Sequence, residues 1–413
     1  MSHRATGGPR RREMIPCMLR ALFWTSTALV VYTHAGYPAL LWSLGRLARD
    51  DWPAPRGAAR EIDSGRLEGA STPAVSLIVA AHDEENVIAA RVANALALDY
   101  PSERLQIVVA SDGSGDRTVE RARAAGADLV LDLPRAGKVN AQDRAVEHTS
   151  ADVLAFSDAN SAWAPDALSR LVAALAHPDV GYVCGWVRFR SAGGANQEGV
   201  YWRYENAVRA LESRLAGITA GNGAIYAVRA SAYMRLDPRT SHDLSFPFNM
   251  VKRGLRPVYE PWARAEEAMA PTLEGEFRRK RRMMRHAWPT VLGGGMLRPQ
   301  GYGPAYALEI VSHRLLRYAS PALHLVAFGA SSALAARRRP LYTAMLGAQI
   351  AVLAAAAAAP ALDARGASSA RPVVRFARLA RYYVLVTAAL AAGLWDHLRE
   401  GTPTQWDRAE GTR

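Results

Sequence analysis

The chain has little cysteine, little lysine and none of the common glycine-rich phosphate-binding motifs. Its two cysteines, Cys17 and Cys184, have no second cysteine or histidine at metal-ligand spacing, which argues against a disulfide framework and a structural zinc site. No G-x-G-x-x-G follows the first apolar strand-like run, and no G-x-x-x-x-G-K-S/T occurs. The sequence therefore predicts neither a Rossmann dinucleotide site nor a P-loop.

The charge of the chain is strongly positive, with a formal net charge of +13 that comes mainly from arginine. Such a balance is typical of proteins that meet nucleic acid, an anionic membrane surface or a phosphorylated substrate. The interleaved basic and stacking aromatic residues of nucleic-acid binders are missing. We therefore expect membrane lipids and a phosphorylated small molecule as partners, and no nucleic acid.

Apolar residues are concentrated in parts of the chain, because half of the residues are hydrophobic while the mean hydropathy is only −0.09. The first apolar run has roughly thirty residues, more than the ~20 that span a bilayer. A secretory signal peptide would end at a small-residue cleavage site, which this run lacks. We expect an integral membrane protein with apolar segments at 17–47, 320–336, 341–362 and 382–398.

Two details of these segments stay open. Gly36-Tyr37-Pro38 interrupts the first run and predicts either a kinked span or a re-entrant pair. Residues 371–381 have arginines and apolar side chains at helical spacing, which fits an amphipathic helix on an anionic leaflet or an ordinary exposed helix. The predicted organisation is a tail and membrane helix (1–48), a linker (49–73), a soluble domain (74–300), a C-terminal membrane region (301–398) with the interfacial helix near 371–381, and a tail (399–413).

The soluble domain alternates apolar strands with helical segments. This order predicts an α/β fold with a parallel sheet and with its ligand chemistry at the carboxyl ends of the strands. Carboxylates stand at three such ends: Asp83 with Glu84, then Asp112, then Asp158 in FSDANS. A single aspartate is often only a cap or turn residue, which is our interpretation of Asp116. Three strand ends in chain order predict a nucleotide site built from acids, with hard oxygen ligands for a divalent metal.

Several stretches of this domain carry further motifs: SLIVAAHDEENVI, VVASDGSGDRT, AGKVNAQDRAV, FSDANS, GNGAIYAVR, SHDLSFPFNMVKRGLRPVYEP and FRRKRRMMRHAW. Together they resemble a membrane-bound family 2 glycosyltransferase, in the group of hyaluronan, poly-N-acetylglucosamine and cellulose synthases. FSDANS resembles the D-x-D segment, here D-x-N. FRRKRRMMRHAW resembles the Q-x-x-R-W segment, in which Arg279 replaces Gln, Arg282 is kept and Met283 replaces Trp. The resemblance covers nearly the whole chain and implies a GT-A domain, a Rossmann-like fold for nucleotide-diphospho-sugars, with N- and C-terminal transmembrane helices.

The resemblance also implies roles for single residues. Asp158, with the neutral Asn160 beside it, would hold Mg²⁺ or Mn²⁺ on the donor diphosphate. Asp243 takes the place of the base that removes the proton from the acceptor hydroxyl, and His242 next to it is the alternative base. The residues expected to bind the donor nucleotide are Asp83, Glu84, Glu85, Asp112, Lys138, Asp158, Arg279 and Arg282.

We therefore expect an inverting glycosyltransferase that moves a sugar, with a UDP-sugar as the expected donor, to a glycan or lipid-linked acceptor. Its domain at 74–300 is expected on the cytoplasmic side of a bacterial inner membrane, where nucleotide sugars are available. A catalytically degenerate membrane scaffold of a polysaccharide assembly system is the alternative, supported by Asn160, Arg279 and Met283. The donor sugar, the acceptor and the choice between polymerisation and single transfer stay open. Trp406 resembles the family's tail and receives no role.

Overall fold

The computed structural model describes residues 9–47, 72–190, 197–268, 272–365 and 371–405. The chain divides into two compact units, one made of Met1–Leu40 with Val311–Ala391 and the other of Leu41–Ile310 with Ala392–Arg413. Most of the predicted linker at 49–73, and Trp406, lie outside the described residues. The second unit contains the predicted soluble domain.

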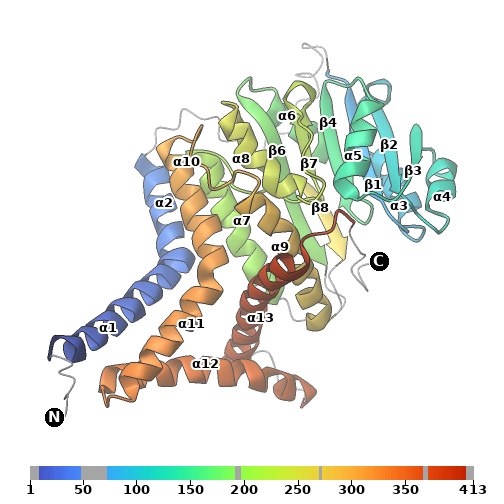
Figure 1. Ribbon diagram of the computed structural model, residues 1–413. Coiled ribbons are helices and arrows are strands. Elements are labelled where there is room, and N and C mark those ends of the chain that lie inside the picture. Colours follow the sequence, from blue (N-terminus) through green and yellow to red (C-terminus); the bar gives the residue numbers. More distant parts are fainter. Residues whose placement is uncertain (1–8, 48–71, 191–196, 269–271, 366–370, 406–413) are drawn as a thin grey trace, which may run out of the picture. The chain divides into compact units, whose positions relative to one another are not determined.

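One eight-stranded sheet forms the framework of the second unit (Figure 1). Its strand order is β3-β2-β1-β4-β7-β6-β8-β5. Pairing is parallel from β3 to β4 and between β6 and β8, whereas β7 is antiparallel to both of its neighbours and β5 is antiparallel to β8. The strands are β1 Val75–Ala81, β2 Leu105–Asp112, β3 Leu129–Leu133, β4 Val153–Asp158, β5 Ala162–Trp163, β6 Val180–Arg190, β7 Tyr226–Arg229 and β8 Arg256–Ala268. The predicted α/β fold is confirmed, with a mixed rather than an all-parallel sheet.

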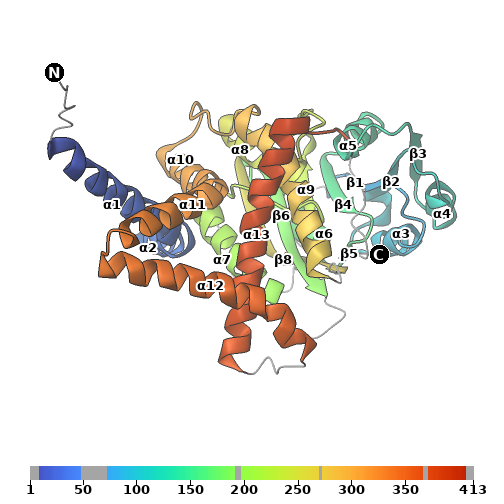
Figure 2. The same cartoon turned by 60° about the horizontal axis from the view of Figure 1, so that its bottom comes forward.

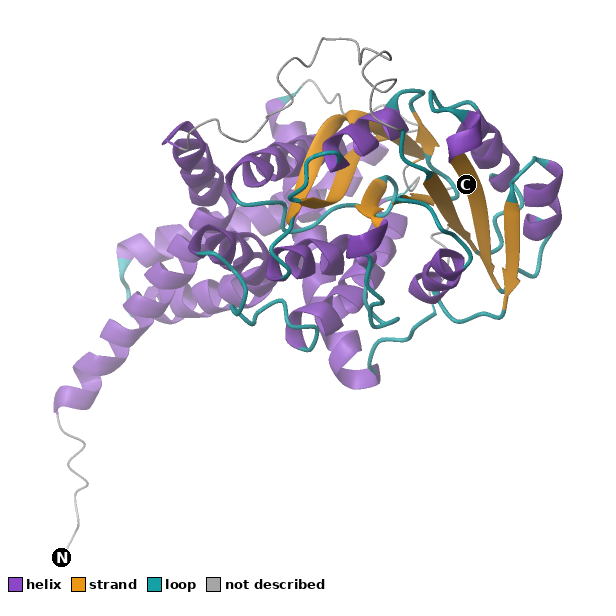
Figure 3. Cartoon of the chain, turned by 90° about the horizontal axis from the view of Figure 1, so that it is seen from above, coloured by secondary structure: helices purple, strands orange, loops and turns teal. Residues whose placement is uncertain are grey.

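Helices pack on both faces of the parallel half of the sheet (Figures 2 and 3). Successive residues of a strand point to opposite faces, so Ile78 of β1 packs with α5 while Val79 packs with α3 and α4. All seven residues of β1 are buried, which explains why this strand is apolar throughout rather than alternating. The helices of this unit are α3 Ile88–Leu96, α4 Thr118–Ala124, α5 Lys138–Glu147, α6 Ala167–Leu175, α7 Gln197–Leu215, α8 His242–Lys252, α9 Leu273–Leu292 and α10 Pro304–Glu309, with short 3-10 turns at Ser102–Arg104 and Ala230–Ala232.

The first unit is helical. Its elements are α1 Pro9–Val31, the π-helical turn Tyr32–Gly36, the start of α2 Tyr37–Leu47, the π-helical turn Ile310–Leu315, α11 Leu316–Ala335, α12 Pro340–Ala364 and most of α13 Pro372–Glu400. Among the described residues, three helical segments are long and apolar enough to cross a membrane: Met14–Arg46, Pro340–Ala364 and Pro372–Glu400. The apolar run expected at 320–336 lies in α11, which is not one of these three.

Both open details of the apolar segments have a structural answer. The chain stays helical through Gly36-Tyr37-Pro38, because the Tyr37 N–H bonds the Tyr32 carbonyl five residues back and so carries the helix into α2. The first run is thus one continuous helical segment and not a re-entrant pair. Residues 372–381 do not form a separate helix, since α13 runs unbroken from Pro372 to Glu400.

Candidate active site

The carboxyl ends of β1, β2 and β4 lie level with one another. Ala80 of β1 pairs with Asp158 of β4, and Ala81 pairs with Ser111, the residue before Asp112. The loops that leave these strands therefore start at the same edge of the sheet. The structure brings the three predicted groups of acids together at that edge, as parallel pairing requires.

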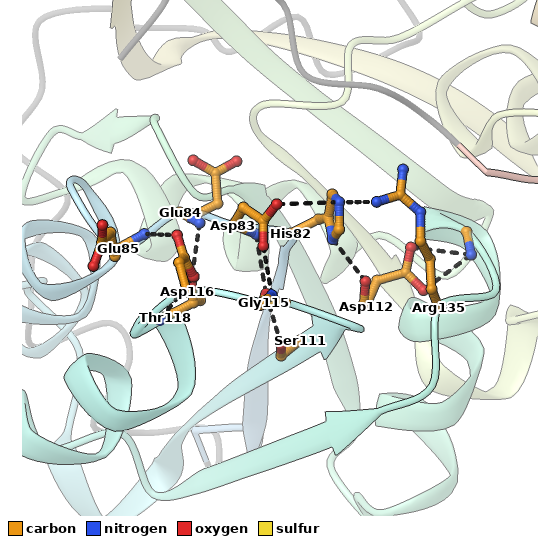
Figure 4. Close-up of polar contacts among 12 residues, drawn as sticks. His82, Asp83, Glu84, Glu85, Ser111, Asp112, Gly115, Asp116, Thr118 and Arg135 are labelled. Carbon is orange, nitrogen blue, oxygen red and sulfur yellow. Dashed lines mark hydrogen bonds and ion pairs between the residues drawn. The ribbon is translucent and has the colours of Figure 1, made fainter.

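The loop after β1 is tied to the loop after β2 through all three of its acidic residues (Figure 4). The contacts are those of Asp83 Oδ1 with the Gly115 N–H (2.6 Å), of the Glu84 N–H with Thr118 Oγ1 (2.7 Å) and of the Glu85 N–H with Asp116 Oδ2 (3.1 Å). Asp116 also accepts a hydrogen bond from the Thr118 N–H, at 3.0 Å, and so has the turn role predicted for it.

Within this loop the three acids differ in what they offer a ligand. Asp83 has a φ of 50°, in the left-handed region that residues with a Cβ rarely occupy, and its carboxylate is held beside the Gly115 N–H. Glu84 is buried, and Glu85 forms an ion pair with Arg117 at 3.1 Å. The carboxylates of Asp83 and Glu85 are thus each held by a contact with the loop after β2, and Glu84 is buried.

Asp112 is buried at the end of β2 and anchors the start of α5. Its Oδ1 accepts from the N–H groups of Ala136 (2.7 Å) and Gly137 (3.0 Å), and its Oδ2 also lies 3.0 Å from the Gly137 nitrogen. Two N–H groups thus bond this carboxylate, and the Gly137 N–H is shared between its two oxygens, which leaves capacity for further hydrogen bonds. A nucleotide base would therefore meet a carboxylate whose orientation is already fixed.

A histidine and an arginine that the sequence did not single out stand next to Asp112 (Figure 4). His82 Nδ1 lies 2.8 Å from the Asp112 carbonyl oxygen, which can only accept, so Nδ1 carries the proton. His82 Nε2 is then an acceptor, and the Arg135 guanidinium donates to it. This chain of contacts holds the cationic Arg135 beside the strand-end acids, with Asp83 Oδ2 3.6 Å from His82 Nε2.

Lys138 and Asp158 meet at the centre of the site. Lys138 is the first residue of α5, and its ammonium group forms an ion pair with Asp158 Oδ1. Burial lowers the pKa of Lys138, but Asp158, with smaller contributions from Asp243 and Glu267, outweighs burial and raises this pKa above its usual value. The lysine is therefore charged, and it has three carboxylates within electrostatic range.

The residues around Asp158 fit a divalent metal in their chemistry. Asp158 offers a carboxylate, and Asn160 offers an amide oxygen two residues later in the turn that the Ser161 N–H closes on the Asp158 carbonyl (3.3 Å). Gly223 leaves room at this point, because a Cβ there would stand 3.2 Å from Lys138 Nζ and 3.6 Å from Asp158 Oδ2. Oxygen ligands of this kind suit Mg²⁺ and Mn²⁺. Among the described residues, no group of three or more His, Cys, Asp or Glu side chains is placed to hold a metal ion.

Glu267 is an acid of this site that sequence reasoning missed. It lies near the end of β8, and its Oε1 accepts a hydrogen bond from the Ser161 hydroxyl. Burial, followed by the Asp158 carboxylate, raises the pKa of Glu267 to about 7, while Ser161, Arg279 and Lys138 act in the opposite direction. The pattern around β8 contains no turn or motif that marks this residue.

Asp243 and His242 begin α8 but have different surroundings. Asp243 is half-buried, its carbonyl accepts from the Gly221 N–H at 2.8 Å, and its carboxylate contributes to the raised pKa of Lys138. His242 is buried among Phe156, Tyr226 and other rings, with Nδ1 2.7 Å from the Tyr226 hydroxyl. Burial, with a smaller effect of Lys138, lowers the pKa of His242 to about 3. Of the two candidate bases, only Asp243 is accessible.

The two predicted arginines of α9 have separate environments. Arg279 binds the buried Glu276 through Nε (2.7 Å) and Nη2 (2.9 Å), and its charge reaches Glu267. Arg282 lies within electrostatic range of His286, whose pKa it helps to lower after burial, the main cause. The structure therefore places Arg279 near the acids of the site and Arg282 near His286.

Arg91 supports the turn after β4 and was also missed. It is buried in α3, donates from Nε to Ser157 Oγ at 2.9 Å and from Nη1 to Asn94 Oδ1 at 2.8 Å, and lies over the Trp163 ring. Asn94 in turn binds both the N–H and the carbonyl of Trp163. Burial lowers the pKa of Arg91 to about 9. The signal in the sequence is an arginine inside the apolar stripe of a short amphipathic helix.

The fold of the chain is similar to that of a solved glycosyltransferase. The chain resembles a mannosyltransferase from Pyrobaculum calidifontis, determined in complex with GDP-Man and Mn²⁺, with 22% identity and a TM-score of 0.67 over 92% of this chain and 99% of that one. The likeness confirms the predicted GT-A-like fold. Residues 76–256 match the family model of glycosyl transferase family 2. This segment of the chain is thus similar to glycosyl transferase family 2, as the sequence motifs predicted.

Two curated relatives share part of the chain. An N-acetylglucosaminyltransferase of Rhizobium meliloti is 28% identical over 287 residues, which cover 63% of this chain and 65% of the relative. A beta-monoglucosyldiacylglycerol synthase of Synechocystis sp. is 31% identical over 186 residues, which cover 42% of this chain and 38% of the relative. The matched segments thus span less than the full length of either relative.

Proposed function

We propose that the chain is an inverting glycosyltransferase that moves a sugar from a nucleoside-diphosphate donor, expected to be a UDP-sugar, to a glycan or lipid-linked acceptor. The observation that carries this proposal is the group of Lys138, Asp158 and Asp243, one cation and two carboxylates at the carboxyl edge of the sheet. The names of the relatives support the class of reaction, since they cover transfer of N-acetylglucosamine and glucose, and the solved mannosyltransferase holds a sugar nucleotide.

The donor diphosphate would lie at the start of α5. Lys138 would exchange its contact with Asp158 for the phosphates, and the partial positive charge of the helix N-terminus favours an anion there. Arg135 and the strand-end acids would face the nucleoside. A divalent ion, Mg²⁺ or Mn²⁺, held by Asp158 and Asn160 would neutralise the charge of the leaving diphosphate.

Asp243 would act as the base. It stands in the first turn of α8, where the helix N-terminus favours negative charge. Its carboxylate would accept the proton of the acceptor hydroxyl as that oxygen attacks the anomeric carbon from the face opposite the leaving diphosphate, which inverts the configuration. His242 cannot take this role from its buried position against Tyr226.

A membrane location would bring the domain to its acceptor. In the described part of the chain, three helices are long and apolar enough to cross a membrane, and we propose that they anchor the chain in a bacterial inner membrane with the transferase domain on the cytoplasmic side. Sugar nucleotides are made in the cytoplasm, whereas a lipid-linked acceptor stays in the bilayer. An enzyme that transfers the sugar from one to the other must reach both the cytoplasm and the bilayer.

The proposal is tested with the full chain purified in detergent. It is mixed with radiolabelled UDP-glucose, UDP-N-acetylglucosamine, UDP-galactose and GDP-mannose, each with a lipid extract and Mn²⁺, and both labelled product and released nucleoside diphosphate are measured. We expect one donor to give labelled lipid or glycan, and the Asp243→Asn variant to form this product at least about a hundredfold more slowly. If no donor is consumed under any condition, the degenerate scaffold replaces the enzyme as the better interpretation.

A further inference from the structure

The turn that carries Asp158 has one carboxylate fewer than the D-x-D pattern it resembles, because Asn160 is a neutral amide. Divalent ions such as Mg²⁺ are usually held in proteins by one or two carboxylates together with substrate phosphates. A single carboxylate beside a neutral amide stands at the lower end of this range of charge. Another acid that reaches the same turn would restore its charge.

We propose that Glu267 supplies the second carboxylate of the divalent-metal site, in place of the one that position 160 lacks. This inference rests on the proposed function, because it presupposes a metal ion on Asp158. Glu267 lies outside every motif that carries the family resemblance. Its strand, β8, follows Asp158 in the chain only after β5, β6 and β7.

The geometry anchors Glu267 to the turn of the proposed metal ligands. β5 pairs with β8 so that Ala162 stands opposite Glu266, and the next residue of β8 is Glu267. Ser161 is buried and makes two contacts: its N–H bonds the Asp158 carbonyl at 3.3 Å, and its hydroxyl donates to Glu267 Oε1. One residue thus joins the backbone of Asp158 to the carboxylate of Glu267.

The charges around Glu267 also favour a cation between it and Asp158. The two carboxylates interact electrostatically, and the cations that face Glu267 are Lys138 of α5 and Arg279 of α9. Arg279 is bound to Glu276 and Lys138 to Asp158. When the donor phosphates draw Lys138 away, the two interacting carboxylates would repel each other, and a divalent ion between them would remove that repulsion.

A purely structural role is the rival explanation. Glu267 would then only brace Ser161, which a neutral glutamine could also do through its amide oxygen. The matched control is Glu266, the preceding residue of β8, whose carboxylate lies 3.7 Å from Arg188 instead. Neighbouring residues of a strand point to opposite faces, so Glu266 shares the strand but not the site.

The experiment measures Mn²⁺ binding directly. The full chain in detergent, with UDP present, is titrated with Mn²⁺, and free Mn²⁺ is followed by its electron paramagnetic resonance signal. We expect Glu267→Gln to raise the Kd for Mn²⁺ by about 10- to 100-fold, the range typical of losses around metal sites. Glu266→Gln should leave this Kd unchanged. Asn160→Asp combined with Glu267→Gln should restore it to within a few-fold of wild type, because the D-x-D pattern is rebuilt.

Each outcome decides between the explanations. An unchanged Kd in Glu267→Gln, or a raised Kd that Asn160→Asp does not restore, overturns the role of Glu267 while leaving a metal on Asp158 intact. If wild type binds no Mn²⁺ with UDP present, both this inference and the metal of the proposed function are wrong, whereas sugar transfer in the presence of a chelator still reports on the enzyme itself. Should Glu267→Gln fail to fold, Glu267→Asp keeps the charge but withdraws it by one methylene, and an unchanged Kd in that variant also overturns the proposal.

Discussion

Replacing Asp243 with asparagine distinguishes two possible roles of this residue, that of the catalytic base and that of a residue needed only at the start of α8. Asparagine keeps the shape of the side chain and the backbone contact of residue 243 with the Gly221 N–H, so the fold and donor binding should survive. The proton acceptor is lost, and removal of a general base typically costs ~10²- to 10⁴-fold in rate. A hundredfold loss corresponds to about 2.7 kcal/mol of transition-state stabilisation. The neighbouring His242 cannot compensate, because it is buried with its Nδ1 against Tyr226.

The assay for Asp243→Asn compares kcat for labelled transfer with the Kd for UDP in the same preparation. We expect kcat to fall by at least about a hundredfold while the Kd stays within a few-fold of wild type. Asp237→Asn is the control, since Asp237 is exposed and pairs with Arg239 at 2.6 Å. Near-normal transfer by a correctly folded Asp243→Asn protein would refute the assignment of the base.

Three further perturbations test other parts of the site. Lys138→Met should raise the Kd for UDP by about 10- to 100-fold, because a charge-assisted contact contributes about 1.5–3 kcal/mol. The Kd is measured by titration calorimetry, and an unchanged Kd would contradict the role of Lys138. Arg91→Met should lower the rate of transfer by ~10-fold or more with only a small shift in Tm, because the substitution displaces the turn of Asp158 without unfolding the domain. A variant with the same transfer rate and the same Tm as wild type would argue against that role of Arg91. His242 has a folded pKa of about 3, below its ordinary 6.5, so its contribution to stability is present above pH 6.5 and is lost as the pH falls. As the pH falls from 6.5 to 3, the free energy of unfolding of wild type should drop relative to that of His242→Phe by up to about 1.4 kcal/mol per pH unit. Chemical unfolding at several pH values measures both free energies, and an equal pH dependence of the two proteins would exclude this role of His242.

The parallel half of the sheet could be predicted because its signals are local. Strands such as Val75–Ala81 are apolar throughout, and each is followed within a few residues by a polar turn and a helix. The register then follows from parallel pairing, which brings Asp83, Asp112 and Asp158 to one edge without any knowledge of long-range contacts. Site residues on these loops were therefore within reach of the sequence.

The second half of the sheet could not be predicted, because its pairings join distant segments. β8 carries polar and charged residues along Arg256–Ala268 and gains its place by pairing with both β6 and β5. Glu267 reaches Ser161 only through that pairing. Arg91 was missed for a different reason: a buried guanidinium is rare, and its partner Ser157 belongs to another element. The fixed orientation of Asp112 likewise depends on backbone groups that no sequence pattern reveals.

The two departures from the family pattern change the charge of the site in the same direction. Asn160 removes a negative charge from D-x-D, and Arg279 adds a positive charge where the pattern has glutamine. Both changes weaken a cation site and strengthen the attraction for a diphosphate. Glu276 offsets part of the second change, because it is buried and Lys280 and Arg279, acting against burial, hold its pKa below the usual value. Glu267, on our proposal, offsets the first. A scaffold freed from catalysis would have no need of one acid that interacts with Asp158 and another that pairs with Arg279, so the substitutions fit an enzyme with redistributed charges better than one that has lost its reaction.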